Sequence, residues 1–115
     1  MTAGLTTHVL DTSREGPAEG VEVTLFRLED GDRERLTAAT TNPDGRVDEP
    51  LLGVDDIEAG TFELVFEVGD YYRERSTEST FLDEVPVRFV IDNPTEHYHV
   101  PLLLAPGSYT TYRGS

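Results

Sequence analysis

The sequence predicts an all-β sandwich that carries one short helix. Apolar and polar residues alternate over several short segments, which is typical of strands with one buried face. Turn-forming residues separate these segments at short intervals. About seven or eight such strands fit into the chain, which is the pattern of a β-sandwich. With 115 residues the chain has room for a single domain, residues 1–115, and not for a second independent unit.

The first three predicted strands are marked by their alternation and by the turns between them. Residues 5–10 form a short run that ends at Asp11, and residues 21–28 read VEVTLFRL, with the two valines and the first leucine on one face. An Asp-Gly pair within residues 29–33 predicts a hairpin. The hairpin leads into a threonine-rich strand over residues 35–41.

The middle of the chain is expected to hold a strong turn, a surface crossing, a strand and the helix. Residues 42–45 read Asn-Pro-Asp-Gly, a strong turn sequence, and residues 46–60 are expected to cross the surface. Residues 61–68 (TFELVFEV) alternate well and predict a strand. Residues 69–76 are the best helix candidate, with Asp70 as the expected N-cap.

Three further strands are expected towards the C-terminus. They cover residues 85–91, 98–104 and 110–113, and a proline–glycine turn separates the last two. Chain ends usually carry little information, yet this one reads Tyr-Arg-Gly-Ser. A phenol, a guanidinium, a glycine and a hydroxyl in succession suit a segment that folds into a polar pocket.

The composition excludes several classes of protein. The chain contains no cysteine, which excludes disulfides, thiol catalysis and cysteine metal sites. No apolar run approaches the roughly 20 residues of a membrane span. Residues 1–4 show neither the charged nor the apolar region of a signal peptide. A cytoplasmic location is therefore the expectation.

The charge is strongly negative. Twenty-three acidic residues face nine basic residues, all arginine, which gives a formal net charge of −14. Such a field repels nucleic acids and anionic membranes, so neither is expected as a partner. Disorder, a basic protein partner and life in high salt could each explain the acidity. High salt is the preferred explanation, because the acids are scattered among regular apolar strands instead of forming one block.

The three histidines are the first candidates for chemistry. His97 and His99 are two positions apart on a predicted strand, so their side chains share one face. Such a pair could bind a metal if His8 or a carboxylate supplied a third ligand. The absence of cysteine and of a His-Glu-x-x-His helix argues against a metal. The alternative is that one or both histidines belong to a core hydrogen-bond network.

Two arginines and one serine are the next candidates. Arg46 follows the turn at residues 42–45, which would hold its guanidinium at the rim of a sheet. Arg46 and Arg113 could equally be solvated surface residues. Ser115 lacks a Gly-x-Ser-x-Gly context, so a nucleophilic role is unsupported, although its hydroxyl could still orient water.

Several motifs together resemble one family. They are LTTHVLD at residues 5–11, GVEV at 20–23, DGR at 44–46, HYHVPLLL at 97–104 and YRGS at 112–115. Over nearly its full length the chain resembles the 5-hydroxyisourate hydrolases, transthyretin-like enzymes of urate breakdown. The YRGS motif separates these enzymes from transthyretin itself, the hormone carrier. Small departures from the family pattern occur at Ala105, Ser108 and Leu82-Asp83, outside the polar motifs.

The resemblance implies a role for each polar residue of the motifs. The matching catalytic positions are His8, Arg46, His99 and Ser115, the matching substrate contacts are His8, Arg46 and Tyr112, and the supporting positions are His97, Arg113 and Gly114. The implied reaction is hydrolysis of the six-membered ring of 5-hydroxyisourate without a metal or an organic cofactor. An imidazole with a near-neutral pKa suits the base, and either His8 or His99 could serve. Arg46 could stabilise the oxyanion.

The resemblance also implies an architecture and an assembly. We expect a transthyretin-like sandwich of two four-stranded sheets, assembled as a homotetramer that is a dimer of dimers. The first alternative function is a non-catalytic carrier of small ligands on the same sandwich, as transthyretin is. The second is an acidic adhesion or interaction module. Neither alternative needs the histidines, Arg46 and YRGS together.

Overall fold

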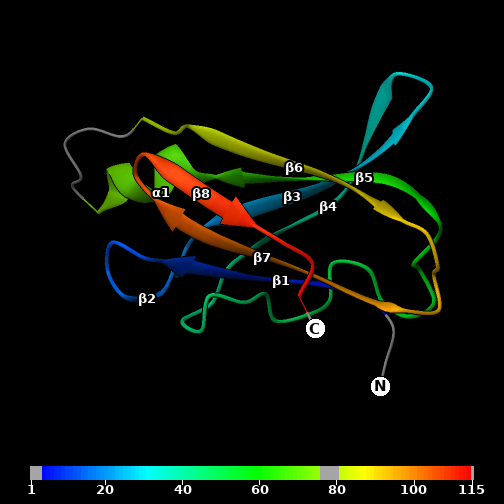
Figure 1. The fold of residues 1–115 in the computed structure, drawn as a ribbon, viewed down its shortest axis with the longest axis horizontal. Coiled ribbons are helices and arrows are strands. Elements are labelled where there is room, and N and C mark those ends of the chain that lie inside the picture. Colours follow the sequence, from blue (N-terminus) through cyan, green and yellow to red (C-terminus); the bar gives the residue numbers. More distant parts are fainter. Residues whose placement is uncertain (1–3, 76–80, 115) are drawn as a thin grey trace.

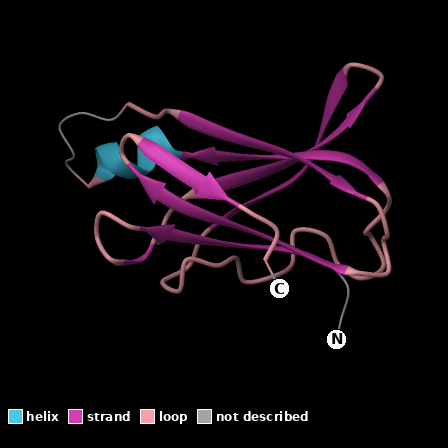
Figure 2. Cartoon of the chain, viewed as in Figure 1, coloured by secondary structure: helices cyan, strands magenta, loops and turns pink. Residues whose placement is uncertain are grey.

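The computed structural model describes residues 4–75 and 81–114 and contains two four-stranded sheets and one short helix (Figures 1 and 2). The first sheet has the strand order β2-β1-β7-β8, and the second has the order β4-β3-β5-β6. The elements in chain order are β1 (Gly4–Asp11), β2 (Gly16–Pro17), β3 (Glu22–Glu29), β4 (Asp32–Thr40), β5 (Gly60–Glu67), α1 (Val68–Glu74), β6 (Glu84–Ile91), β7 (His97–Ala105) and β8 (Ser108–Thr111). The predicted all-β sandwich with one short helix is confirmed.

The core lies between the two sheets and follows the alternation of the sequence. Leu25 on β3 and Leu64 on β5 are fully buried in the second sheet. Val9 on β1 and Leu102 on β7 are fully buried in the first. Each such side chain contributes about 1.5–3 kcal/mol through its removal from water. Among the described residues, no helix is long and apolar enough to cross a membrane.

The pairing of β1 with β7 positions the candidate site. These strands run parallel, which places Thr6 opposite His99 and His8 opposite Pro101. Tyr98 is buried in the core, whereas His99 next to it is half-buried on the outer face of the sheet. The motif near the start of the chain and the motif near its end therefore share one outer surface.

The helix forms where expected but is held differently from the prediction. It begins at Val68, Glu67 occupies the N-cap position without a side-chain hydrogen bond, and Asp70 lies in the first turn. The expectation that Asp70 caps the helix is therefore wrong, and residue 76, its expected end, lies outside the described residues. Buried Tyr71 and Tyr72 anchor the helix instead.

Asp11 receives both tyrosines of the helix. The hydroxyls of Tyr71 and Tyr72 donate to its carboxylate at 2.8 and 3.0 Å. Burial alone would raise the pKa of Asp11, but hydrogen bonds from Ser13, Tyr71 and Tyr72 outweigh it and hold the pKa below its ordinary value. Tertiary hydrogen bonds, not a local cap, thus fix α1 against the first sheet.

Some strand limits differ from the sequence prediction. Asp30 and Gly31 both have positive φ, of 52° and 83°, so the hairpin is tight and β4 begins at Asp32. The last strand ends at Thr111, not at residue 113, because the chain beyond it leaves the ladder. The two-residue strand β2 was not predicted, since a Gly-Pro pair has no alternation.

Carboxylates gather at one end of the second sheet, and this makes a testable prediction. Glu67 on β5 lies directly opposite Glu84 on β6. Burial, the charge of Glu84 and a hydrogen bond with Glu84 raise the pKa of Glu67 from 4.5 to about 7. A raised carboxyl pKa stabilises the fold fully below pH 4.5, and that contribution is lost as pH rises through about 7.

We therefore expect Glu67→Gln to raise the melting temperature at pH 8 by roughly 2–5 °C and to change it little at pH 4. The glutamine reproduces the protonated side chain, so the benefit arises only where the native carboxyl is ionised. Thermal unfolding at both pH values and constant salt measures it, with the exposed Glu49→Gln as control. A gain at pH 8 no larger than at pH 4 contradicts the prediction.

Candidate active site

Four of the predicted site residues meet on the outer face of the first sheet. An isolated antiparallel bridge joins His8 to Arg46, and another joins His99 to Gly114. Because β1 and β7 are neighbours, the two bridges lie side by side across the sheet. The Arg46 loop flanks β1, and Gly114 flanks β7. The structure thus brings His8, Arg46 and His99 onto one surface.

The turn before Arg46 is built to dock onto β1. The side-chain oxygen of Asn42 accepts the backbone N–H groups of Asp44 at 2.9 Å and Arg46 at 3.2 Å. Gly45 is buried with a φ of +75°, and its carbonyl accepts the N–H of Val9 at 2.7 Å. A Cβ at position 45 would overlap the carbonyl oxygen of Val9. Glycine is therefore required for the loop to place Arg46 beside His8.

His8 is oriented by the same turn. Its ring nitrogen Nε2 lies 2.9 Å from the backbone oxygen of Asp44. A carbonyl oxygen only accepts, so Nε2 of His8 carries a proton and donates it. A neutral His8 then has its lone pair on Nδ1.

Thr6 links the other two histidines, and sequence reasoning missed it. Its hydroxyl oxygen lies 3.2 Å from Nε2 of His97 and 2.8 Å from Nδ1 of His99. The two imidazole rings are nearly parallel, 14° apart, with centroids 6.4 Å apart. The available signal was the alternation of β1, since Thr6 is two positions before His8 and shares its face.

His99 stands in an environment that disfavours its charge. Its burial, the positive charge of Arg46 and the repulsion that His8 and His97 would exert when protonated lower the pKa of His99 below the ordinary value of 6.5. The imidazole is therefore neutral at pH 7. A neutral imidazole offers one N–H and one lone pair, which is what proton transfer requires.

The segment after β8 returns to β7 at Gly114. The N–H of Gly114 donates to the carbonyl of His99 at 2.8 Å. A Cβ at this position would lie 2.6 Å from Cδ2 of His99 and 3.2 Å from Cγ of Pro101. Gly114 thus packs directly against the imidazole of His99. Ser115 lies outside the described residues, so its role stays a prediction.

Arg113 and Tyr112 point elsewhere within a single chain. Arg113 donates to Glu96 at 3.0 Å and to the carbonyl of His97 at 3.2 Å, and its guanidinium lies 4.1 Å from the ring centroid of Tyr98. It therefore secures the start of β7, and its supporting role in the site stays a prediction. Tyr112 is exposed and lines a cavity of about 270 Å³ between β6 and the end of β8.

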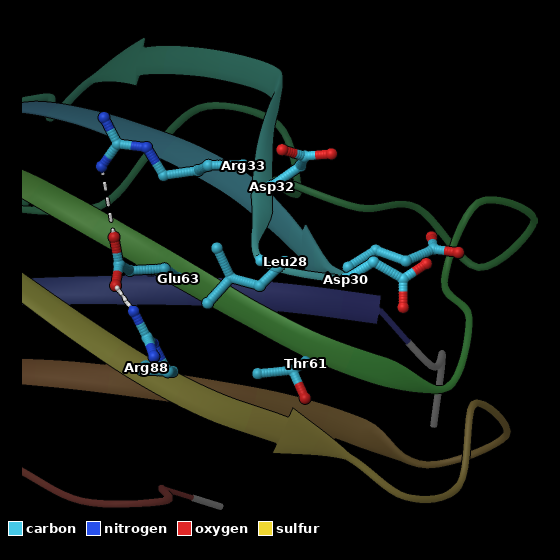
Figure 3. A pocket seen from close by; sticks show the side chains of 9 residues that line it. Leu28, Asp30, Asp32, Arg33, Thr61, Glu63 and Arg88 are labelled. Atoms are coloured by element: carbon cyan, nitrogen blue, oxygen red, sulfur yellow. Dashed lines mark hydrogen bonds and ion pairs between the residues drawn. The ribbon is translucent and has the colours of Figure 1, made fainter.

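A second cavity, of about 430 Å³, lies on the outer face of the second sheet (Figure 3). In it Glu63, whose side chain is 8% exposed, pairs with Arg33 and Arg88 at 3.3 Å each. This network covers the sheet with paired charges. Neither cavity is lined by His8, Arg46 or His99, so the candidate site is an open face of the single chain.

The geometry argues against the metal interpretation of the histidines. Nε2 of His97 and Nδ1 of His99 both face the hydroxyl of Thr6, so they cannot also hold one ion. In the described part of the chain, no three His, Cys, Asp or Glu side chains are grouped to hold a metal.

Comparisons with known proteins agree with the fold and with the family that the sequence resembles. The HIUase/Transthyretin family matches residues 5–114. The 5-hydroxyisourate hydrolase of Halalkalibacterium halodurans is 52% identical over 119 residues, covering all of both chains. The Klebsiella pneumoniae 5-hydroxyisourate hydrolase structure has a TM-score of 0.83 at 36% identity and covers 98% of this chain and 100% of its own.

A transthyretin structure is similar as well. Sea bream transthyretin in complex with thyroxine has a TM-score of 0.88 at 25% identity and covers 97% of this chain and 95% of its own. The sandwich is therefore common to a hydrolase and to transthyretin, and the family match spans nearly all described residues. This chain belongs to the HIUase/Transthyretin family.

Proposed function

We propose that this chain is a 5-hydroxyisourate hydrolase of urate degradation, a branch of purine metabolism. Its product would be 2-oxo-4-hydroxy-4-carboxy-5-ureidoimidazoline. The observation that carries the proposal is the placement of Arg46, His8 and His99 across one face of the first sheet. The 52% identity to a 5-hydroxyisourate hydrolase over the whole chain supports it.

The residues suit hydrolysis of a cyclic amide. The oxygen of water adds to the ring carbonyl carbon, the carbon–nitrogen bond breaks, and the released nitrogen takes up a proton. A neutral imidazole can accept the proton of water, and Arg46 can stabilise charge on the carbonyl oxygen with its planar fork. Ser115 is proposed to orient the water, and Tyr112 to contact the substrate from the adjoining segment. The chemistry needs no metal or organic cofactor.

The carrier alternative is less well supported by the site. A carrier of apolar ligands gains nothing from three polar side chains on one face, whose desolvation opposes binding. Sea bream transthyretin, crystallised with thyroxine, is 25% identical to this chain, half the identity of the hydrolase relative. An acidic adhesion module would likewise leave the paired bridges of His8 and His99 without a purpose.

We further propose a homotetramer, a dimer of dimers, in a cytoplasm of high salt. Apolar side chains are exposed on one edge strand of each sheet, with Val90 on β6 57% exposed and Tyr109 on β8 42% exposed. Pairing between such edges would cover them. The open face that carries His8 and His99 would become an enclosed channel if a second dimer packed against it.

The salt hypothesis gives a prediction for stability and assembly. With a formal charge of −14 and no lysine, repulsion within and between subunits is unscreened in dilute buffer. We expect multimolar KCl to raise the melting temperature by on the order of 10 °C and to hold the tetramer together. Thermal unfolding and sedimentation across a KCl series measure both. A melting temperature that stays flat or falls with salt refutes the hypothesis.

The function itself is tested by ultraviolet absorbance of freshly made 5-hydroxyisourate in high salt. The substrate also decays unaided, so the rate without protein is subtracted. We expect the protein to accelerate ring opening, and to do so equally after dialysis against a chelator. No acceleration by the folded protein would sink the proposal, and activity restored by zinc after chelation would overturn the cofactor-free mechanism.

A further inference from the structure

We propose that Thr6 is a positioning residue whose hydroxyl fixes the proton of His99 on Nε2, so that His99 presents an N–H group to the open face. The motivating geometry is the bridge from Nε2 of His97 through the Thr6 hydroxyl to Nδ1 of His99, at 3.2 and 2.8 Å. The chemical consequence rests on the proposed hydrolase function, whereas the proton positions rest on geometry alone.

His97 determines which groups donate and which accept in this pair of hydrogen bonds. Its Nδ1 atom is buried and has no hydrogen-bond partner among the described residues. A buried N–H without an acceptor costs about 1–3 kcal/mol, and orphaned donors are rarer in proteins than under-used acceptors. Nδ1 of His97 is therefore the unprotonated nitrogen, and Nε2 carries the proton. That N–H donates to the Thr6 hydroxyl oxygen.

Because the Thr6 hydroxyl accepts from His97, its own hydrogen is free to be donated to His99. It has a single hydrogen, and the nearest other acceptor given by the described side chains is Nδ1 of His99, at 2.8 Å. If both histidines donated to Thr6, the hydroxyl hydrogen would have no acceptor in the described part of the chain. Thr6 therefore donates to Nδ1 of His99. Neutral His99 then has its proton on Nε2.

His8 and His99, both half-buried, consequently offer different groups to a substrate. His8 donates its Nε2 proton to the Asp44 carbonyl and keeps a lone pair on Nδ1. His99 accepts at Nδ1 and offers the N–H of Nε2. His8 is thus prepared to take a proton from water, and His99 to donate to a carbonyl oxygen or to the leaving nitrogen. Thr6 itself contacts neither the water nor the substrate in this scheme, and it acts through its hydrogen bond to His99.

The proton positions can be read by nuclear magnetic resonance without any substrate. Long-range 1H–15N correlation spectra of the uniformly 15N-labelled full chain separate protonated from unprotonated ring nitrogens. Single His→Gln variants assign the three rings. We expect all three histidines to be Nε2-protonated at neutral pH and Thr6→Val to give His99 a mixture of both forms, with His8 unchanged. A proton on Nδ1 of His99 in the wild-type chain overturns the proposal.

The functional arm compares three threonine variants. Thr6→Val keeps the shape of the side chain but removes the hydroxyl, and we expect kcat to fall roughly 10- to 100-fold with KM nearly unchanged. Thr6→Ser restores the hydroxyl and should recover most of the activity. Thr7→Val is the matched control. It removes the buried hydroxyl that donates to the Val100 carbonyl at 2.7 Å on the opposite face, so stability should fall while kcat holds.

The outcomes separate this proposal from the proposed function. If wild-type protein does not turn over 5-hydroxyisourate, the hydrolase proposal fails. The spectra still decide whether Thr6 fixes the proton of His99 on Nε2. If wild-type protein hydrolyses the substrate and Thr6→Val keeps full kcat, the positioning role of Thr6 is refuted and the hydrolase proposal stands. Should Thr6→Val not fold, the wild-type spectra and the kcat of Thr6→Ser remain decisive, since a serine variant with kcat as low as a His99 variant would also refute the role of the hydroxyl.

Discussion

Replacing Arg46 or His99 by alanine is expected to lower turnover of 5-hydroxyisourate at least about 100-fold in each case. In the proposed mechanism Arg46 supplies the charge that stabilises a developing oxyanion, and Arg46 is bridged to His8. In the same mechanism His99 supplies a neutral imidazole, because burial and the guanidinium of Arg46 disfavour its charged form. Both side chains lie on the surface of the sheet, so the folded core should survive either change.

Two variants serve as controls for these losses. Arg35→Ala removes an exposed arginine from β4 of the second sheet and should leave kcat unchanged. His97→Ala should lower kcat less than His99→Ala, because the Thr6 hydroxyl can still donate to Nδ1 of His99 when His97 is absent. Measurements of kcat and of thermal unfolding decide the matter. If a folded His97→Ala protein is as impaired as His99→Ala, the roles assigned within the His-Tyr-His motif are wrong.

The local features of the fold could be predicted from the sequence because their causes are local. The alternation over residues 61–68 predicted a strand with Leu64 on its buried face, and the Asp30-Gly31 pair predicted the hairpin. The Asn42–Gly45 turn was expected from its residue types, and it is closed by the Asn42 side chain. Each of these elements depends on neighbours within a few positions.

The features that failed prediction depend on distant residues. The cap expected at Asp70 was overridden by Tyr71 and Tyr72, whose partner Asp11 is about sixty positions away in the chain. Thr6 was unremarkable in the sequence, because only the parallel pairing of β1 with β7 sets it opposite His99. No spacing rule connects residues separated by more than ninety positions.

The candidate site was identified in the sequence by its motifs and is explained by the sheet. The structure brings His8, Arg46, His99 and Gly114 together, and it turns Arg113 away towards Glu96. Tyr112 lines the cavity at the strand edges instead of the histidine face. The direction of these two side chains follows from the chain leaving the β8 ladder after Thr111, which residue types alone do not reveal.

Removing residues 112–115 is expected to lower turnover at least about 100-fold while the melting temperature falls by only a few degrees. The β7–β8 ladder up to Thr111 remains intact in the shortened chain. The lost contacts of Arg113 are exposed, and exposed ion pairs contribute about 0–1 kcal/mol. The lost contacts at His99 are the hydrogen bond from Gly114 and the packing against its ring. We therefore expect function to depend on this segment more than the fold does.

A single substitution tests the same contact without shortening the chain. In Gly114→Val the new Cβ would lie 2.6 Å from the His99 ring, so either the imidazole or the segment must move. We therefore expect the kcat of this variant to fall, as it should in the truncated protein. Gly107→Ala is the matched control, because a Cβ in the β7–β8 turn meets nothing within 4 Å. Turnover, melting and sedimentation are compared for all three proteins. Near-wild-type turnover in the truncated chain, or equal kcat in Gly114→Val and Gly107→Ala, would show that the segment after Thr111 has no part in positioning His99.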